Sequence, residues 1–306
     1  MGSKLVRFIF FGNYFIGILA IALTIESTLQ LKLPFNSLAY YALIFCAPIV
    51  YYTYAYMGAN KFSQSSNPRV AWYVKHHLFL ARSQFVLGVS SIGLFAYLFF
   101  ANLSSILQLP LPYWVFVFIV LGAAALYYGL LPSVFFNLNL RNTGWLKPLI
   151  IGFIWACTAN ILPLILLKIE SGHPFPTDIL WLWLFIKNWM FCTVNAIMFD
   201  IKDYAIDANK ELKTFVVQVG IRRTIFYILL PLLTIGILSF LIFAYIRNFP
   251  LLQAGFNLIP FLLTMVVAFS MHHRKRILYY LIVIDGLIFV KAVCGILGVL
   301  LAPYLR

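Results

Sequence analysis

Charged residues are scarce in this chain, and acids are the scarcest of them. Of 306 residues only 10% are charged and eight are Asp or Glu, whereas 63% are apolar. Soluble domains carry about 25% charged residues, so this composition excludes an ordinary water-soluble globular protein. The mean hydropathy of +0.96 agrees. We therefore expect a lipid bilayer to be the main solvent of the chain.

Cysteines and linker-like segments are also few. The chain has four cysteines, all within apolar runs and without a CxxC pair, so neither a disulfide framework nor a zinc site is indicated. No Pro/Ser-rich linker, low-complexity segment or repeat period is evident. The sequence therefore predicts a single transmembrane domain over residues 1–306.

Long apolar runs dominate what is present. Runs of about 20 residues can cross the hydrocarbon layer, and their backbone groups must be hydrogen-bonded within the segment, so each is predicted to be a helix. The fold class is all-α: a polytopic membrane protein of about nine transmembrane helices. A cleaved signal peptide is the alternative for the first run, but its apolar stretch continues past the candidate cleavage site, which favours a retained helix. The runs cover residues 8–28, 38–59, 83–101, 113–133, 147–167, 179–199, 224–246, 251–271 and 277–301.

The basic residues are distributed unevenly between alternate loops. With a cytoplasmic N-terminus, sixteen Lys and Arg fall in inside segments and four (Lys32, Lys168, Arg247, Arg306) in outside segments. This positive-inside bias predicts a cytoplasmic N-terminus in a plasma membrane, specifically a bacterial inner membrane. The net charge of +14 then indicates topology and attraction to membrane lipid rather than a nucleic-acid partner. The predicted cytoplasmic loops are 60–82, 134–147, 200–223 and 272–276.

Half of the acids cluster just after the sixth apolar run. Asp200, Asp203 and Asp207 stand at i, i+3 and i+7, which places them along one face of a helix. Carboxylates this close repel each other, so a compensating cation is expected, and Mg²⁺ bridging to a diphosphate would supply it. The alternative is a solvated interfacial helix whose aspartates pair with neighbouring lysines. Asn188 and Asn195 share one face of the helix that leads into this aspartate stripe.

The stretch from Asp200 to Gly220, DIKDYAIDANKELKTFVVQVG, resembles the second aspartate-rich motif of the UbiA superfamily of intramembrane prenyltransferases. That family has nine helices, and its motif likewise follows the sixth helix. The first aspartate-rich motif of the family lies in the loop after helix two. Here that loop contains no acid, although Asn67-Pro68-Arg69 is similar to the tail of the family motif.

The resemblance implies an enzyme that moves an isoprenoid group from an allylic diphosphate to a hydrophobic acceptor, with Mg²⁺ as cofactor. Asp200, Asp203 and Asp207 are the implied catalytic residues and metal ligands, and we expect them to line one cytoplasm-facing cavity with loop 60–77. Alternatively, each of these basic loop residues serves only to orient the protein in the membrane. The candidate substrate-binding residues are Asn60, Lys61, Asn67, Arg69, Lys75, Arg141, Lys147, Asn188, Asn195, Lys202 and Lys213.

Two other functions fit parts of the sequence. The acid-free first loop favours a non-catalytic UbiA-like protein that binds an isoprenoid lipid or a protein partner. Lys187, Asp285 and Lys291 lie within apolar runs, where ionisable residues point to function, so a transporter is a third hypothesis. Asp285 and Lys291 fall on different faces of one helix, and each needs a partner elsewhere. No pair of broken helices supports transport.

Overall fold

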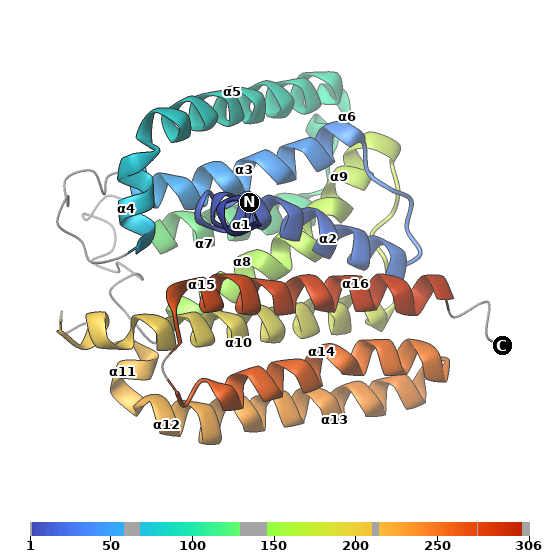
Figure 1. Ribbon diagram of the computed structural model, residues 1–306. Helices are drawn as coiled ribbons and strands as arrows, with labels where there is room; N and C mark the ends of the chain where they lie inside the picture. The colour runs from blue at the N-terminus through green and yellow to red at the C-terminus, as the bar shows by residue number, and fades with distance from the viewer. Residues whose placement is uncertain (1, 58–67, 129–145, 210–213, 274, 302–306) are drawn as a thin grey trace. The chain divides into compact units, whose positions relative to one another are not determined.

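The computed structural model describes residues 2–57, 68–128, 146–209, 214–273 and 275–301. Most of these residues are helical, and no strand occurs among them (Figure 1). The chain folds as two compact units. The first unit comprises residues 1–22, 34–109 and 166–173, and the second comprises residues 23–33, 110–165 and 174–306.

Helices occur in each of the nine predicted ranges, but they differ in length and continuity. Six are long and apolar enough to cross a membrane: His77–Ala101, Lys147–Ser171, Ile179–Tyr204, Ile221–Ile246, Leu251–Ser270 and Ile277–Leu301. A seventh span is possible if the bent pair Lys4–Phe11 and Tyr14–Gln30 is taken as one. The apolar helices Leu38–Tyr54 and Leu111–Ala124 are shorter. The described residues thus form a helical membrane protein, and the count of nine crossings is not confirmed.

The first unit contains α1 (Gly2–Phe11), the start of α2 (Tyr14–Gln30), α3 (Leu38–Met57), α4 (Pro68–Lys75), α5 (His77–Ala101), α6 (Leu103–Leu107) and the end of α9 (Leu162–Ser171). Helix α3 packs along α5, and Tyr40, Ile44 and Leu98 form a small buried core between them. Much of the rest of α5 is exposed and apolar, as in Phe85 and Ile92. A face of this kind is suited to hydrocarbon.

The prediction of one continuous helix over residues 8–28 is wrong, because the chain bends by 67° between α1 and α2. Asn13 lies at the break with a φ of 63°, a left-handed conformation that Asn tolerates better than most residues. Its buried amide donates to Thr53 Oγ1 at 3.0 Å and accepts from Arg69 Nη2 at 2.6 Å. These partners come from distant segments, so apolar periodicity alone did not reveal the break.

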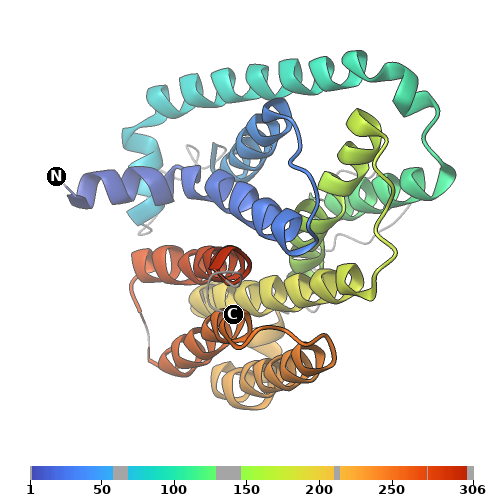
Figure 2. The ribbon, with the colours of Figure 1, turned by 90° about the vertical axis from the view of Figure 1, so that its right-hand side faces the viewer.

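The second unit contains the end of α2, α7 (Leu111–Tyr128), α8 (Lys147–Asn160), the start of α9 and α10 (Ile179–Asn209). It continues with α11 (Phe215–Val219), α12 (Ile221–Thr224), a π-helical turn (Ile225–Leu229), α13 (Leu230–Ile246) and α14 (Leu251–Ser270). It ends with α15 (Ile277–Tyr279), a second π-helical turn (Tyr280–Ile284) and α16 (Asp285–Leu301). Helices α13 and α14 run side by side, as Figure 2 shows.

Close packing in the second unit centres on α10. Helix α8 lies along it, and Gly152 faces Thr193 so closely that a Cβ at this position would clash. On another side, Phe191 stacks edge-on to Phe261 of α14 within a fully buried apolar core. This packing fixes α10, which carries the aspartates and the two asparagines singled out above.

Candidate functional site

Asp200 of α10 lies at the interface with α8. Its side chain is 3% exposed, and Lys147, the first residue of α8, donates to Oδ1 at 2.6 Å. The other carboxylate oxygen, Oδ2, is buried without a hydrogen-bond partner. A buried carboxylate needs a cation and hydrogen-bond donors. Lys147 satisfies one oxygen and leaves the other available as an acceptor.

The rest of the aspartate stripe is more open. Asp203, one turn later, has a 36% exposed side chain and pairs with Lys202 at 3.3 Å. The backbone of Asp207 continues α10, but its side chain lies outside the described residues. Both described carboxylates of the stripe therefore have a lysine partner. The Asp203–Lys202 pair matches the alternative of a solvated helix whose aspartates pair with neighbouring lysines, whereas Asp200 is buried and its partner comes from α8.

The described residues supply only part of a magnesium ligand set. Among them, no group of three or more His, Cys, Asp or Glu side chains is arranged to hold a metal ion. The unpartnered Oδ2 of Asp200 and the half-open Asp203 could contribute carboxylate oxygens, the ligand type that Mg²⁺ prefers. The two described aspartates therefore supply part of a ligand set, and the Mg²⁺ site stays a prediction.

Several predicted substrate-binding residues lie outside the described part of the chain: Asn60, Lys61, Asn67, Arg141 and Lys213. Of loop 60–77, residues 68–77 are described and belong to the first unit, whereas the aspartate stripe belongs to the second. A cavity that both segments line therefore stays a prediction.

Two predicted phosphate-binding cations in the first unit differ in environment. Arg69 is 4% exposed and donates through Nη2 to Asn13 Oδ1 and to Phe11 O, so it holds the break between α1 and α2 together. Lys75, at the end of α4, is exposed. The ligand roles of both residues stay predictions, but Arg69 has a structural role that the sequence did not reveal.

Asn188 and Asn195 are both buried in α10. Asn195 donates to the backbone oxygen of Phe191 at 2.7 Å, and its own Oδ1 is buried without a hydrogen-bond partner. Asn188 accepts a hydrogen bond from Lys291 of α16. Polar side chains within a membrane helix commonly hydrogen-bond to a neighbouring helix, and Asn188 does so.

Sequence reasoning missed the role of Glu26 in α2. Glu26 is 1% exposed and accepts from Lys291 Nζ at 2.5 Å, and Lys187 Nζ lies 3.7 Å from its other oxygen. Gln30 donates to the same carboxylate at 3.0 Å. We call Glu26, Gln30, Lys187, Asn188, Asn257 and Lys291 the buried polar network.

The sequence did contain a signal for this network. Lys187 and Lys291 were identified as ionisable residues within apolar runs, Lys291 with a partner expected elsewhere, and Glu26 is the one acid within the first apolar run. Opposite charges in separate membrane helices are candidates for pairing. Which helices meet depends on the packing, so the sequence did not show which acid pairs with which lysine.

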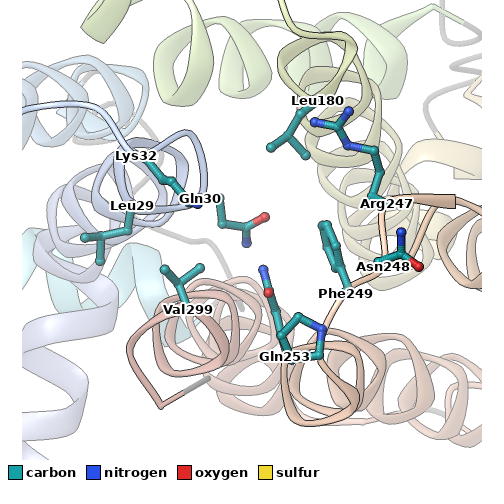
Figure 3. A pocket seen from close by; sticks show the side chains of 10 residues that line it. Leu29, Gln30, Lys32, Leu180, Arg247, Asn248, Phe249, Gln253 and Val299 are labelled. Carbon is teal, nitrogen blue, oxygen red and sulfur yellow. The ribbon is translucent and has the colours of Figure 1, made fainter. Parts of the chain in front are cut away.

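A cavity of about 550 Å³ lies beside the buried polar network in the second unit. Figure 3 shows Gln30, Phe249 and Gln253 pointing into it, with Arg247 and Leu180 along one side. Gln30 belongs both to the cavity wall and to the network. The described residues that line it are Leu29, Gln30, Lys32, Leu180, Arg247, Asn248, Phe249, Pro250, Gln253 and Val299.

Comparisons of the chain with protein-family models, with curated proteins and with solved structures found no match.

Proposed function

We propose that this chain is a UbiA-like membrane prenyltransferase that moves an isoprenoid group from an allylic diphosphate to a hydrophobic acceptor. The observation that supports the proposal is the environment of the Asp200 carboxylate. Lys147 holds this buried carboxylate at one oxygen, and the other oxygen remains available for a cation that accompanies a diphosphate. The motif resemblance supplies the reaction class.

In the proposed reaction, the bond between the allylic carbon and the diphosphate oxygen breaks, and the diphosphate leaves with the electron pair. The acceptor forms a bond to that carbon and releases a proton. Charge stabilisation of the leaving group is the main catalytic requirement. Mg²⁺ would neutralise diphosphate charge when it is bound to the aspartate stripe. Lys202, which pairs with Asp203, would contact the same anion.

A non-catalytic protein that binds an isoprenoid lipid or a protein partner is the second candidate. One observation favours it: the lysine partners of Asp200 and Asp203 already compensate both described carboxylates. Retention of the aspartate stripe then requires no metal. The two candidates share the ligand class but differ in turnover and in metal dependence.

The deciding experiment is an assay of the full chain in neutral detergent. A panel of radiolabelled allylic diphosphates is supplied with a lipid extract as the source of acceptor, with and without Mg²⁺. The prenyltransferase proposal predicts a labelled lipid product that requires Mg²⁺ and is lost in Asp203→Asn. Glu170→Gln, an acid-to-amide change in the first unit, is the matched control and should retain activity.

Binding separates the two candidates further. If the chain is an enzyme, an allylic diphosphate should raise the unfolding temperature only in the presence of Mg²⁺, because metal and ligand strengthen each other's binding. Lys75→Gln should weaken this effect at saturating Mg²⁺. Stabilisation by an uncharged isoprenoid without Mg²⁺, and without labelled product, would favour the second candidate. Stabilisation by neither ligand would contradict the enzyme and the lipid-binding form of the second candidate, and would leave its protein-binding form.

A further inference from the structure

The cavity in the second unit lies far from the aspartate stripe. Leu180 lines it near the start of α10, twenty residues before Asp200 on the same helix. At 1.5 Å per residue the two sites are roughly 30 Å apart along α10. The diphosphate site proposed above therefore leaves this cavity unassigned.

The lining combines cations, amides and apolar side chains, and no acid occurs among its described residues. Lys32 follows α2, and Arg247 follows α13, where it also pairs with the exposed Asp178. Gln30 and Gln253 present amide groups, and Phe249 and Val299 contribute apolar surface. Such a wall suits a ligand with an oxyanion head and an apolar body.

The buried polar network behind the cavity carries an excess of positive charge. Two ammonium groups, those of Lys187 and Lys291, share the single carboxylate of Glu26, and all three side chains are at most 5% exposed. Charge that is not compensated within a low-dielectric interior is costly. An anion in the neighbouring cavity would reduce this cost, because Coulomb attraction is weakly screened there.

Two short connections join the cavity to the network. Gln30 lines the cavity and donates to Glu26. On the other side, the backbone oxygen of Gln253 accepts from Asn257, which in turn accepts from Lys187 at 2.8 Å. Gln30 thus stands between the cavity and the Glu26 carboxylate, and Gln253 and Asn257 stand between the cavity and the Lys187 ammonium group.

We propose that this cavity binds an amphipathic organic anion, with a phosphate or carboxylate head toward Arg247 and the amides of Gln30 and Gln253. The apolar body lies against Phe249 and Val299. A membrane phospholipid and a free amphipathic solute share this head-group chemistry, and the experiment distinguishes them.

The test uses the full chain in neutral detergent and measures the unfolding temperature and ligand affinity. Octyl phosphate and octanoate are the solute probes, octanol is the uncharged control, and inorganic phosphate tests the head group alone. Phosphatidylglycerol and phosphatidylcholine, in mixed micelles, are the anionic and zwitterionic lipid probes. We expect the anionic member of at least one set to stabilise the protein and its uncharged or zwitterionic counterpart to have no effect.

Three variants locate the binding. Arg247→Gln and Gln253→Leu should each weaken the anion's affinity about tenfold, as expected for loss of a hydrogen bond to a charged group. Arg223→Gln, an exposed arginine at the start of α12, is the matched charge control and should bind as the wild type does. Circular dichroism and the unliganded unfolding temperature establish that each variant folds.

The identity of the stabilising probe determines the ligand source. Stabilisation by octyl phosphate or octanoate alone identifies a solute site, and stabilisation by phosphatidylglycerol identifies a lipid site. The proposal is overturned if no anion stabilises more than its uncharged or zwitterionic counterpart. It is equally overturned if Arg223→Gln weakens binding as much as Arg247→Gln, because the attraction would then be a property of the whole surface charge.

Discussion

At the scale of single residues, Glu26 is the group on which the buried polar network depends. Replacing it by Gln leaves Lys187 and Lys291 without a counter-charge at positions that are almost fully buried. Breaking a buried ion pair from one side costs about 3 to 5 kcal/mol. We expect Glu26→Gln to lower the free energy of unfolding by an amount in that range, measured by denaturant titration in detergent micelles.

The double variant Glu26→Gln/Lys291→Met is the control for this prediction. It removes one unpaired ammonium group together with the carboxylate, so most of the lost stability should return. If the double variant is as unstable as the single one, the lost stability comes from disturbed packing and not from an unpaired charge.

A second residue-scale prediction concerns Lys147 and Asp200. The carboxylate is 3% exposed and the lysine 21% exposed. Replacing one or the other should therefore lower the free energy of unfolding by different amounts. Lys147→Met leaves a buried carboxylate without its cation, and we expect a loss of about 3 kcal/mol. Asp200→Asn should cost less, because a lysine near the surface can turn its ammonium group toward water. Equal losses in unfolding titrations would argue against this account.

At the scale of helices, the approach of α16 to α2 depends on Gly295. A Cβ at this position would clash with Glu26 and with the amide nitrogen of Gln30. Gly295→Ala should therefore separate the helices and disturb the network, at a cost of about 1 to 3 kcal/mol typical of overpacking. Gly286 of the same helix has no neighbouring atom within 4 Å of an added Cβ. Gly286→Ala is therefore the matched control.

The two glycine variants should change stability in opposite directions. Ala is favoured over Gly within a helix by about 0.5 to 1 kcal/mol, so Gly286→Ala should be neutral or slightly stabilising. Thermal unfolding of both proteins in the same detergent provides the comparison. A Gly295→Ala protein as stable as Gly286→Ala would mean that the two helices are more widely spaced than the structure shows.

At the scale of the whole molecule, the number of crossings determines which side each loop faces. With a cytoplasmic N-terminus and nine crossings, the segment between α5 and α7 lies outside. If the shorter helix Leu38–Tyr54 does not cross, that segment lies inside. We expect Ser104→Cys, an exposed position in α6, to react with an impermeant maleimide in intact cells.

Arg223→Cys is the internal counterpart in this labelling experiment, and it should react only after the membrane is permeabilised. The four native cysteines are buried, so they should contribute little background. Labelling of Arg223→Cys but not Ser104→Cys in intact cells would contradict the prediction, and would mean that the orientation is reversed or that Leu38–Tyr54 does not cross. Protection of both positions would indicate that neither Leu38–Tyr54 nor Leu111–Ala124 crosses.

The sequence by itself determined the solvent, the secondary structure class and the positions of the helices. Hydropathy acts within each segment, because a run of apolar residues must satisfy its own backbone in lipid wherever it lies in the fold. The loop charges predicted an orientation, because the bias between alternate loops can be counted along the chain. The spacing of the three aspartates was enough to place them on one helix face.

Only the tertiary structure decided which polar side chains meet. Glu26 and Lys291 are 265 residues apart in the chain, and Lys147 and Asp200 are 53 apart. The break at Asn13 likewise depends on Thr53 and Arg69. Such partners follow from helix packing, which depends on shape complementarity between surfaces that hydropathy does not distinguish. A sequence pattern therefore revealed which charges need partners, and the packed helices revealed which partners they have.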